Sequence, residues 1–175
     1  MLEWGSPAVH LNSVRGATSD QFRRTMNIRS RPIILLAALW WGSLSGLGFL
    51  VVPLLFTHLP SPAAAGAMAA KLFTAQTWLS IGCTMLLLLV LNKKEAPALS
   101  LSAQAAMKFV VAGLLLAVLV EFGVAPNIVN ARASGGDLRF WHGLGSAMYL
   151  AQWLAAGWTL WSLSLSVKAH ARPTK

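Results

Sequence analysis

Long uncharged runs of hydrophobic residues dominate the chain, and short polar connections separate them. Four runs, at residues 32–56, 72–91, 109–129 and 143–167, are long enough to cross a bilayer as helices, since roughly 30 Å of hydrocarbon requires about 20 residues. These runs and their connections fill residues 32–167, which leaves no room for a separate soluble domain. The pattern therefore predicts an all-α protein, a four-helix transmembrane bundle.

The two ends of the chain lie outside this predicted bundle. Residues 1–31 are polar, basic and without periodicity, and we expect a disordered tail there; residues 168–175 form a second, short basic tail. Met26 stands just ahead of the first run and competes with Met1 as the true start. A cleavable signal peptide is disfavoured, because its apolar core of about 7 to 15 residues is shorter than the first run.

Composition and charge support a membrane location and suggest an orientation. The chain is 56% hydrophobic and 11% charged, which is unusual for a soluble domain. The formal net charge of +9 would suggest nucleic-acid binding in a soluble chain, but here the basic residues gather on one side of the runs. They are Arg15, Arg23, Arg24, Arg29, Arg31, Lys93, Lys94, Lys108, Lys168, Arg172 and Lys175, against Lys71, Arg132 and Arg139 on the other side.

Lys and Arg near membrane spans concentrate in the cytoplasm, so both termini are predicted to be cytoplasmic. The expected location is the inner membrane of a bacterium, with multiple passes, membrane lipids as partners and no nucleic acid.

Glu121 is the only charged residue inside the four runs. A carboxyl group at that depth is costly, so such residues usually face a bundle interior, find a partner and mark function. At a rise of about 1.5 Å per residue, Ser45, Gln76, Glu121 and Gln152 all come out roughly 20 Å from the cytoplasmic ends of their runs. The sequence therefore suggests one intramembrane polar cluster.

The start of the last run extends this cluster outward. His142, Ser146 and Tyr149 are spaced four and three residues apart and share one helix face. His142 and Tyr149 are therefore assigned to the cluster, with Lys71 and Arg139 as outer-side basic partners. Two interpretations stay open: a polar pocket that opens outward, or a structural network in which Glu121 is neutral or paired.

Small residues recur at helical spacing along two runs. Gly42 and Gly46 are one turn apart, and Gly143, Ala147, Ala151 and Ala155 form a ridge in the last run. Such faces allow close helix contact in lipid, either within the bundle or in a homo-oligomer. Cys83 is the single cysteine, which excludes an intramolecular disulfide and a paired thiolate metal site.

Two pentapeptides of similar sequence close the odd-numbered runs. Residues 49–53 read FLVVP and residues 122–126 read FGVAP. This short match suggests a parallel repeat of the two halves. Transporters often carry repeats with sites between them.

Several segments together resemble the bacterial domain of unknown function 4149, or transmembrane protein 205-like, family over residues 31–167. They are residues 39–43 (LWWGS), 48–49 (GF), Pro53, 71–73 (KLF), 121–126 (EFGVAP) and 140–146 (FWHGLGS). The resemblance implies a four-helix integral membrane protein whose biochemical role is not established. It also implies a distant similarity to the membrane part of copper-resistance protein D and to membrane haem-pathway oxidases, which use intramembrane histidines. Here His58 and His142 are the histidines near the runs, and both are peripheral.

Three functional hypotheses follow. The first is a non-catalytic structural or partner-binding component that contains the cluster around Glu121. The second is transport of a small solute, an ion or a proton through Glu121. The third is copper or haem binding through His142 and His58, with Met68 or Met148 as a soft ligand. No phosphate loop, nucleophile elbow or two-histidine motif is present, so we expect neither an enzyme nor a cofactor.

Overall fold

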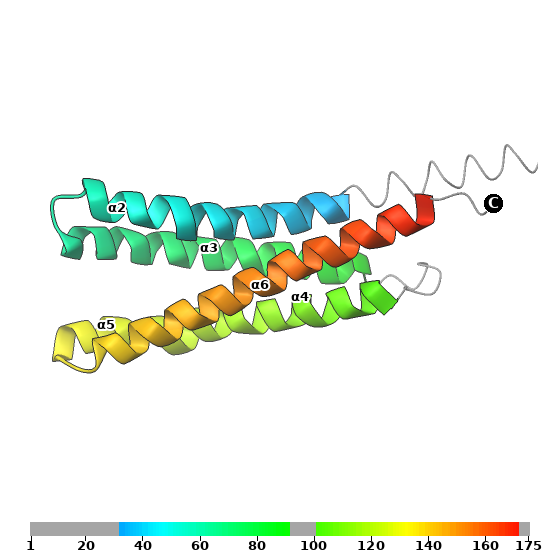
Figure 1. Ribbon diagram of the computed structural model, residues 1–175. Helices are drawn as coiled ribbons and strands as arrows, with labels where there is room; N and C mark the ends of the chain where they lie inside the picture. The colour runs from blue at the N-terminus through cyan, green and yellow to red at the C-terminus, as the bar shows by residue number, and fades with distance from the viewer. Residues whose placement is uncertain (1–31, 92–100, 172–175) are drawn as a thin grey trace, which may run out of the picture.

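The computed structural model describes residues 32–91 and 101–171, which are almost entirely helical and contain no strand (Figure 1). Residues 32–45 form an α-helix that continues as the π-helix η1 (Gly46–Val51) and as α2 (Val52–His58). The next elements are α3 (Pro62–Leu91), α4 (Leu101–Leu119), the π-helix η2 (Val120–Val124), α5 (Ala125–Ser134) and α6 (Leu138–Ala171). The all-α prediction is confirmed. Residues 1–31, with Met26, and residues 172–175 lie outside the described part of the chain.

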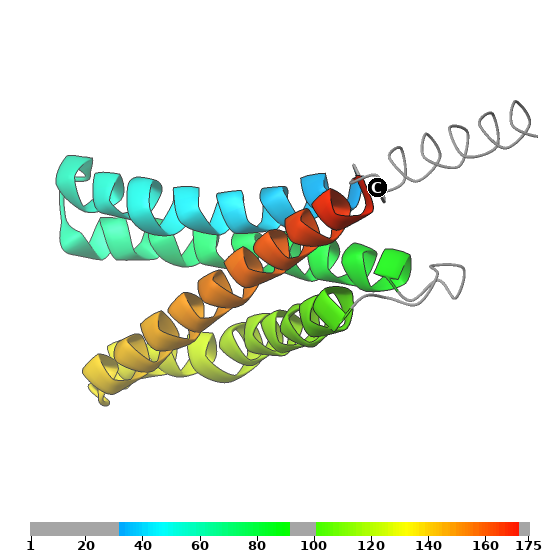
Figure 2. The ribbon, with the colours of Figure 1, turned by 45° about the vertical axis from the view of Figure 1, so that its right-hand side comes forward.

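The helices are arranged as two antiparallel hairpins (Figures 1 and 2). The helix of residues 32–58 is called the first rod. The first hairpin consists of the first rod and α3. The second is α4, η2 and α5 with α6. Helix α4 packs against both α3 and α6, whereas α2 packs on α3 and α5 packs on α6. The hairpins thus approach each other near the end of α3 and diverge toward their tips, as both views show.

The helices are longer than the apolar runs that predict them. Helix α3 begins at Pro62, ten residues before its run at 72–91, because residues 63–70 are rich in alanine, the best helix former. Proline is also favoured in the first turn of a helix, where its missing N–H is not needed. Hydrophobicity marks the lipid-facing length, whereas propensity and caps determine where a helix ends.

The tip of the second hairpin shows such caps. Gly135 ends α5 with a left-handed φ of 74°, a conformation that costs glycine little. Asp137 then starts α6, since its Oδ1 accepts a hydrogen bond from the Phe140 N–H at 2.9 Å. The connection between the second hairpin's helices is therefore a tight turn.

The two pentapeptides adopt the same local structure. The Val52 N–H donates to the Leu47 carbonyl, five residues back rather than four. The Ala125 N–H donates to the Val120 carbonyl in the same way. In both places the next residue is the proline of the pentapeptide. A proline ring clashes with the carbonyl four residues before it, and the wider π turn relieves that clash.

The core lies where the hairpins converge. Trp40 is fully buried and packs with Leu44, Leu87 and Val110. Its ring lies against Gly113 of α4, where a Cβ atom would stand 2.5 Å from Trp40 Cζ2. The missing side chain of Gly113 is therefore what admits the tryptophan.

Three helical stretches are long and apolar enough to cross a membrane: Pro32–His58, Pro62–Leu91 and Gln104–Ser134. Large apolar side chains such as Leu35, Leu89 and Leu115 are exposed along them, as expected for surfaces that face lipid. The structure thus indicates a membrane protein. Helix α6 is longer still, at 34 residues, but it is rich in Trp, Ser and Gly and is not among the stretches that reach this apolar level.

Candidate functional site

A hydrogen-bonded polar layer connects the first rod to α3. Gln76 is buried on α3, and its Nε2 donates to Ser43 Oγ at 2.9 Å and to Ser80 Oγ at 3.3 Å. The Ser43 hydroxyl in turn donates to the Trp40 carbonyl at 3.0 Å. Gln76 therefore joins two helices through a serine that lies two positions before the predicted Ser45.

The same layer connects α6 to the first rod. The Tyr149 hydroxyl donates to the Leu44 carbonyl at 2.7 Å, and Trp153 Nε1 donates to Ser45 Oγ at 2.8 Å. The Tyr149 ring also lies over Gly48, where an added Cβ would stand 2.9 Å from Cε1. Aromatic contacts extend the layer, since Tyr149 meets Phe73 of α3 edge-on at 5.2 Å.

Sequence reasoning missed Ser43 and Trp153 as members of the layer. Ser43 carried a signal, because it is a polar residue in an apolar run. Trp153 carried none, because the many tryptophans of this chain are explained equally well as interfacial anchors. The hydrogen bonds bring Ser45, Gln76 and Tyr149 into one region, whereas the depth estimate grouped Ser45 and Gln76 with Glu121 and Gln152.

Two buried donors in the same region have no hydrogen-bond partner among the described residues. They are Gln152 Nε2, on a side chain that is 4% exposed, and Trp40 Nε1, on a side chain that is fully buried. Gln152 is therefore buried, but its amide nitrogen is not bonded into the layer.

Glu121 stands apart from these bonds. It lies within η2 and is partly exposed, between the buried residues Ala117 and Val124. Val124 packs on α6, since its Cγ1 lies 3.5 Å from the position that a Cβ on Gly145 would take. Glu121 therefore lies at the edge of the helix face that is buried against α6. Within the described part of the chain, its carboxylate has no hydrogen bond or ion pair. Functional sites are frequent at single-turn π segments such as this one.

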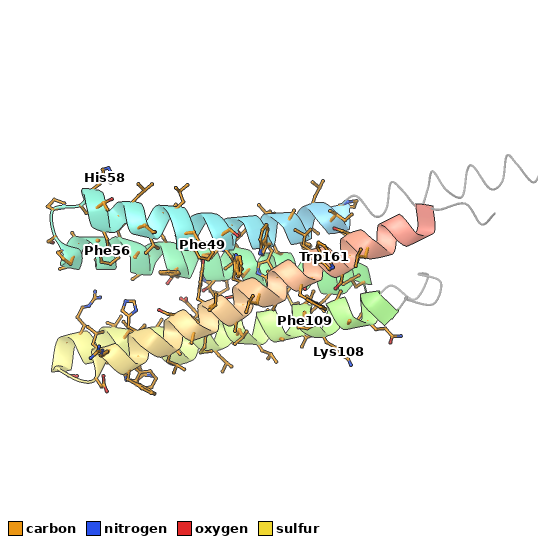
Figure 3. All side chains as sticks on the ribbon, in the orientation of Figure 1. Phe49, Phe56, His58, Lys108, Phe109 and Trp161 are labelled. Carbon is orange, nitrogen blue, oxygen red and sulfur yellow. The ribbon has the colours of Figure 1, made fainter. Side chains whose placement is uncertain are left out.

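The other predicted site residues are exposed. Lys71, Arg139 and His142 make no side-chain hydrogen bond or ion pair within residues 32–91 and 101–171, and none of them is bonded to Glu121. His58 lies at the tip of α2 (Figure 3), where its Nδ1 is 2.8 Å from Thr57 Oγ1 and 3.1 Å from the Leu54 carbonyl. No group of three or more His, Cys, Asp or Glu side chains gathers among the described residues.

Arg132 makes a contact that the sequence did not predict. It belongs to α5 in the second hairpin, yet a Cβ atom on Gly66 of α3 would lie 3.1 Å from its Nη2. The guanidinium therefore crosses from one hairpin tip to the other. The close approach uses the space left by the missing side chain of Gly66.

The predicted small-residue faces are divided between the interior and the surface. Gly42, Gly46 and Gly143 have no atom within 4 Å of where a Cβ would be, whereas Ala155 is buried. Gly42 and Gly46 therefore do not mediate a close helix contact within the described chain. A homo-oligomer that uses these faces stays a prediction.

Comparison with known proteins identifies the family and nothing more specific. Neither a curated protein nor a solved structure matches the chain, so the predicted similarity to copper-resistance protein D stays a prediction. The family model described as Domain of unknown function (DUF4149) matches residues 35–137, which is more than half of the sequence. This chain is therefore a member of the DUF4149 family.

Proposed function

We propose that this chain is a non-catalytic, multi-pass component of the bacterial inner membrane in which α6 forms a fourth span and both termini are cytoplasmic. The packing of α6 along α4 supports this proposal, since α4 lies within one of the three apolar stretches. So do the apolar side chains that α6 exposes: Leu150, Leu154, Trp158, Trp161 and Leu165. The one-sided distribution of Lys and Arg supports the orientation.

Cysteine labelling tests this topology. Cys83 is buried and gives little background, and Ser134 is exposed at the tip of the second hairpin. In spheroplasts, a membrane-impermeant maleimide should label Ser134→Cys. It should label Thr174→Cys only after the cells are lysed. Labelling of Thr174→Cys before lysis would contradict a cytoplasmic carboxyl terminus and a fourth span.

The polar layer is proposed to hold the two hairpins in register, and the Tyr149 to Leu44 hydrogen bond carries this proposal. In a membrane, packing and interhelical hydrogen bonds replace the hydrophobic drive for helix association. The layer contacts the first rod from both α3 and α6. Its proposed role is to hold together two hairpins that diverge toward their tips.

Tyr149→Phe is expected to lower the free energy of unfolding by about 0.5 to 1.5 kcal/mol, because one interhelical hydrogen bond is lost. The thermal midpoint of the detergent-purified protein measures this change. Ser146→Ala is the matched control, because the Ser146 hydroxyl donates to the His142 carbonyl of its own helix at 2.9 Å. Equal midpoints for Tyr149→Phe and Ser146→Ala would remove the interhelical role.

A second function is favoured by the state of Glu121. A half-buried carboxylate without a described partner, on a π segment beside α6, is suited to take a proton or a cation. We therefore also propose transport of a proton or a small cation through Glu121. The Glu121→Gln substitution separates this function from a structural one.

A further inference from the structure

The tips of the two hairpins diverge, and the Arg132 side chain crosses between them (Figures 1 and 2). Helix α2 contacts η1 and α3, and α5 contacts η2 and α6. The Arg132 guanidinium nevertheless lies over Gly66 on the opposite tip. A strongly basic group therefore stands between two apolar helix pairs near one end of their membrane-crossing length.

This guanidinium has no acidic partner among the described residues. The acidic residues in that part of the chain are Glu121 and Asp137, and Asp137 uses its Oδ1 to cap α6. Lys71 and Arg139 add two more exposed cations toward the same end of the molecule. This local excess of positive charge favours the approach of an anion from outside the chain.

The surroundings of Arg132 favour an anion that carries hydrocarbon. His142 shares a helix face with Tyr149, seven residues or about 10 Å further on, and Tyr149 contacts the first rod. That face of α6 is therefore turned toward the first hairpin. Deeper along α6, two aromatic pairs join it to the first hairpin: Phe73 meets Tyr149, and Phe49 meets Trp153 at 5.4 Å.

We propose that the two hairpin tips bind the anionic headgroup of a membrane phospholipid, with Arg132 as the phosphate ligand. A guanidinium binds phosphate oxygens in a bidentate manner, which an ammonium group cannot do. The acyl chains lie against the apolar side chains that α2 and α5 expose, including Phe56 at 50% and Val129 at 62%. This site is independent of either function proposed for Glu121.

Native mass spectrometry of the full chain in detergent tests the proposal. The protein is offered phosphatidylglycerol and phosphatidylcholine in equal amounts. We expect the wild type to retain phosphatidylglycerol preferentially, and Arg132→Gln to bind it about tenfold more weakly, with phosphatidylcholine unchanged. Lys108→Gln is the control, since Lys108 is an exposed cation near the opposite end of the helices (Figure 3).

A second variant keeps Arg132 and its charge but blocks the place that its guanidinium occupies. Gly66→Leu places a side chain where the guanidinium now lies, so it should also abolish the preference for phosphatidylglycerol. Gly82→Leu is its matched control, because no atom lies within 4 Å of a Cβ there. Thermal midpoints verify that all four variants are folded.

Three results would overturn the proposal. One is a wild type that does not discriminate between the two lipids. Another is an equal loss in Lys108→Gln or in Gly82→Leu, which would show that the effect is not local to Arg132. The third is displacement of the lipid by millimolar inorganic phosphate in an Arg132-dependent manner, which would make this a site for the free anion.

Discussion

Gly113→Ala is expected to destabilise the protein by about 1 to 3 kcal/mol, although alanine is the better helix former by about 1 kcal/mol. The added Cβ would lie 2.5 Å from Cζ2 of Trp40 and closer still to Cη2. Trp40 is fully buried, so its rigid ring has nowhere to move. The thermal midpoint of the purified protein, followed by circular dichroism, measures the loss.

Gly82→Ala is the matched control for this substitution. Gly82 is also in a membrane-crossing helix, but no atom lies within 4 Å of a Cβ there, so we expect no loss of stability. Adding Trp40→Phe to Gly113→Ala removes the part of the ring that clashes and should recover part of the midpoint. A Gly113→Ala midpoint equal to that of Gly82→Ala would contradict the packing of Trp40 against α4.

Glu121→Gln is expected to abolish any proton or cation flux while leaving the thermal midpoint unchanged or raised. The substitution removes a costly charge from the membrane interior, and it breaks no hydrogen bond or ion pair among the described residues. Flux is measured in proteoliposomes with a pH-sensitive dye for protons and with ion-sensitive dyes for sodium and potassium.

Two comparisons make this measurement decisive. Glu121→Asp keeps a titratable carboxylate and should retain part of the flux, whereas Tyr149→Phe should lower stability and keep the carboxylate. A fall in the Glu121→Gln midpoint as large as that of Tyr149→Phe would assign Glu121 a structural role. Wild-type flux no greater than that of protein-free vesicles would contradict transport and leave the structural component as the remaining function.

Helix existence was predictable from this sequence, because lipid demands long uncharged runs. The helix ends were less predictable, because Pro62, Gly135 and Asp137 act through local backbone chemistry that hydropathy does not record. The π segments carried a signal that could have been used: each contains part of the F-x-V-x-P pentapeptide. A proline late in a helical run predicts a distortion one turn before it.

The partners within the candidate site were not predictable from the sequence. Counting residues along each run groups four residues at one depth: Ser45, Gln76, Glu121 and Gln152. The structure bonds Ser45 and Gln76 into the polar layer but not the amide nitrogen of Gln152. Counting could not distinguish Ser43 from Ser45 as the partner of Gln76, because that choice depends on how each helix is rotated about its axis. For the same reason it could not predict that the described residues leave Glu121 unpaired.

The sequence by itself determined the membrane class and the family, because these depend on local composition and on spacing along the chain. The tertiary structure decided which small residue admits which large side chain, as with Gly113 under Trp40 and Gly66 under Arg132. It also decided that the hairpins converge at one end and diverge at the other. Such contacts depend on the rotation and crossing of helices far apart in the chain, which no local pattern encodes.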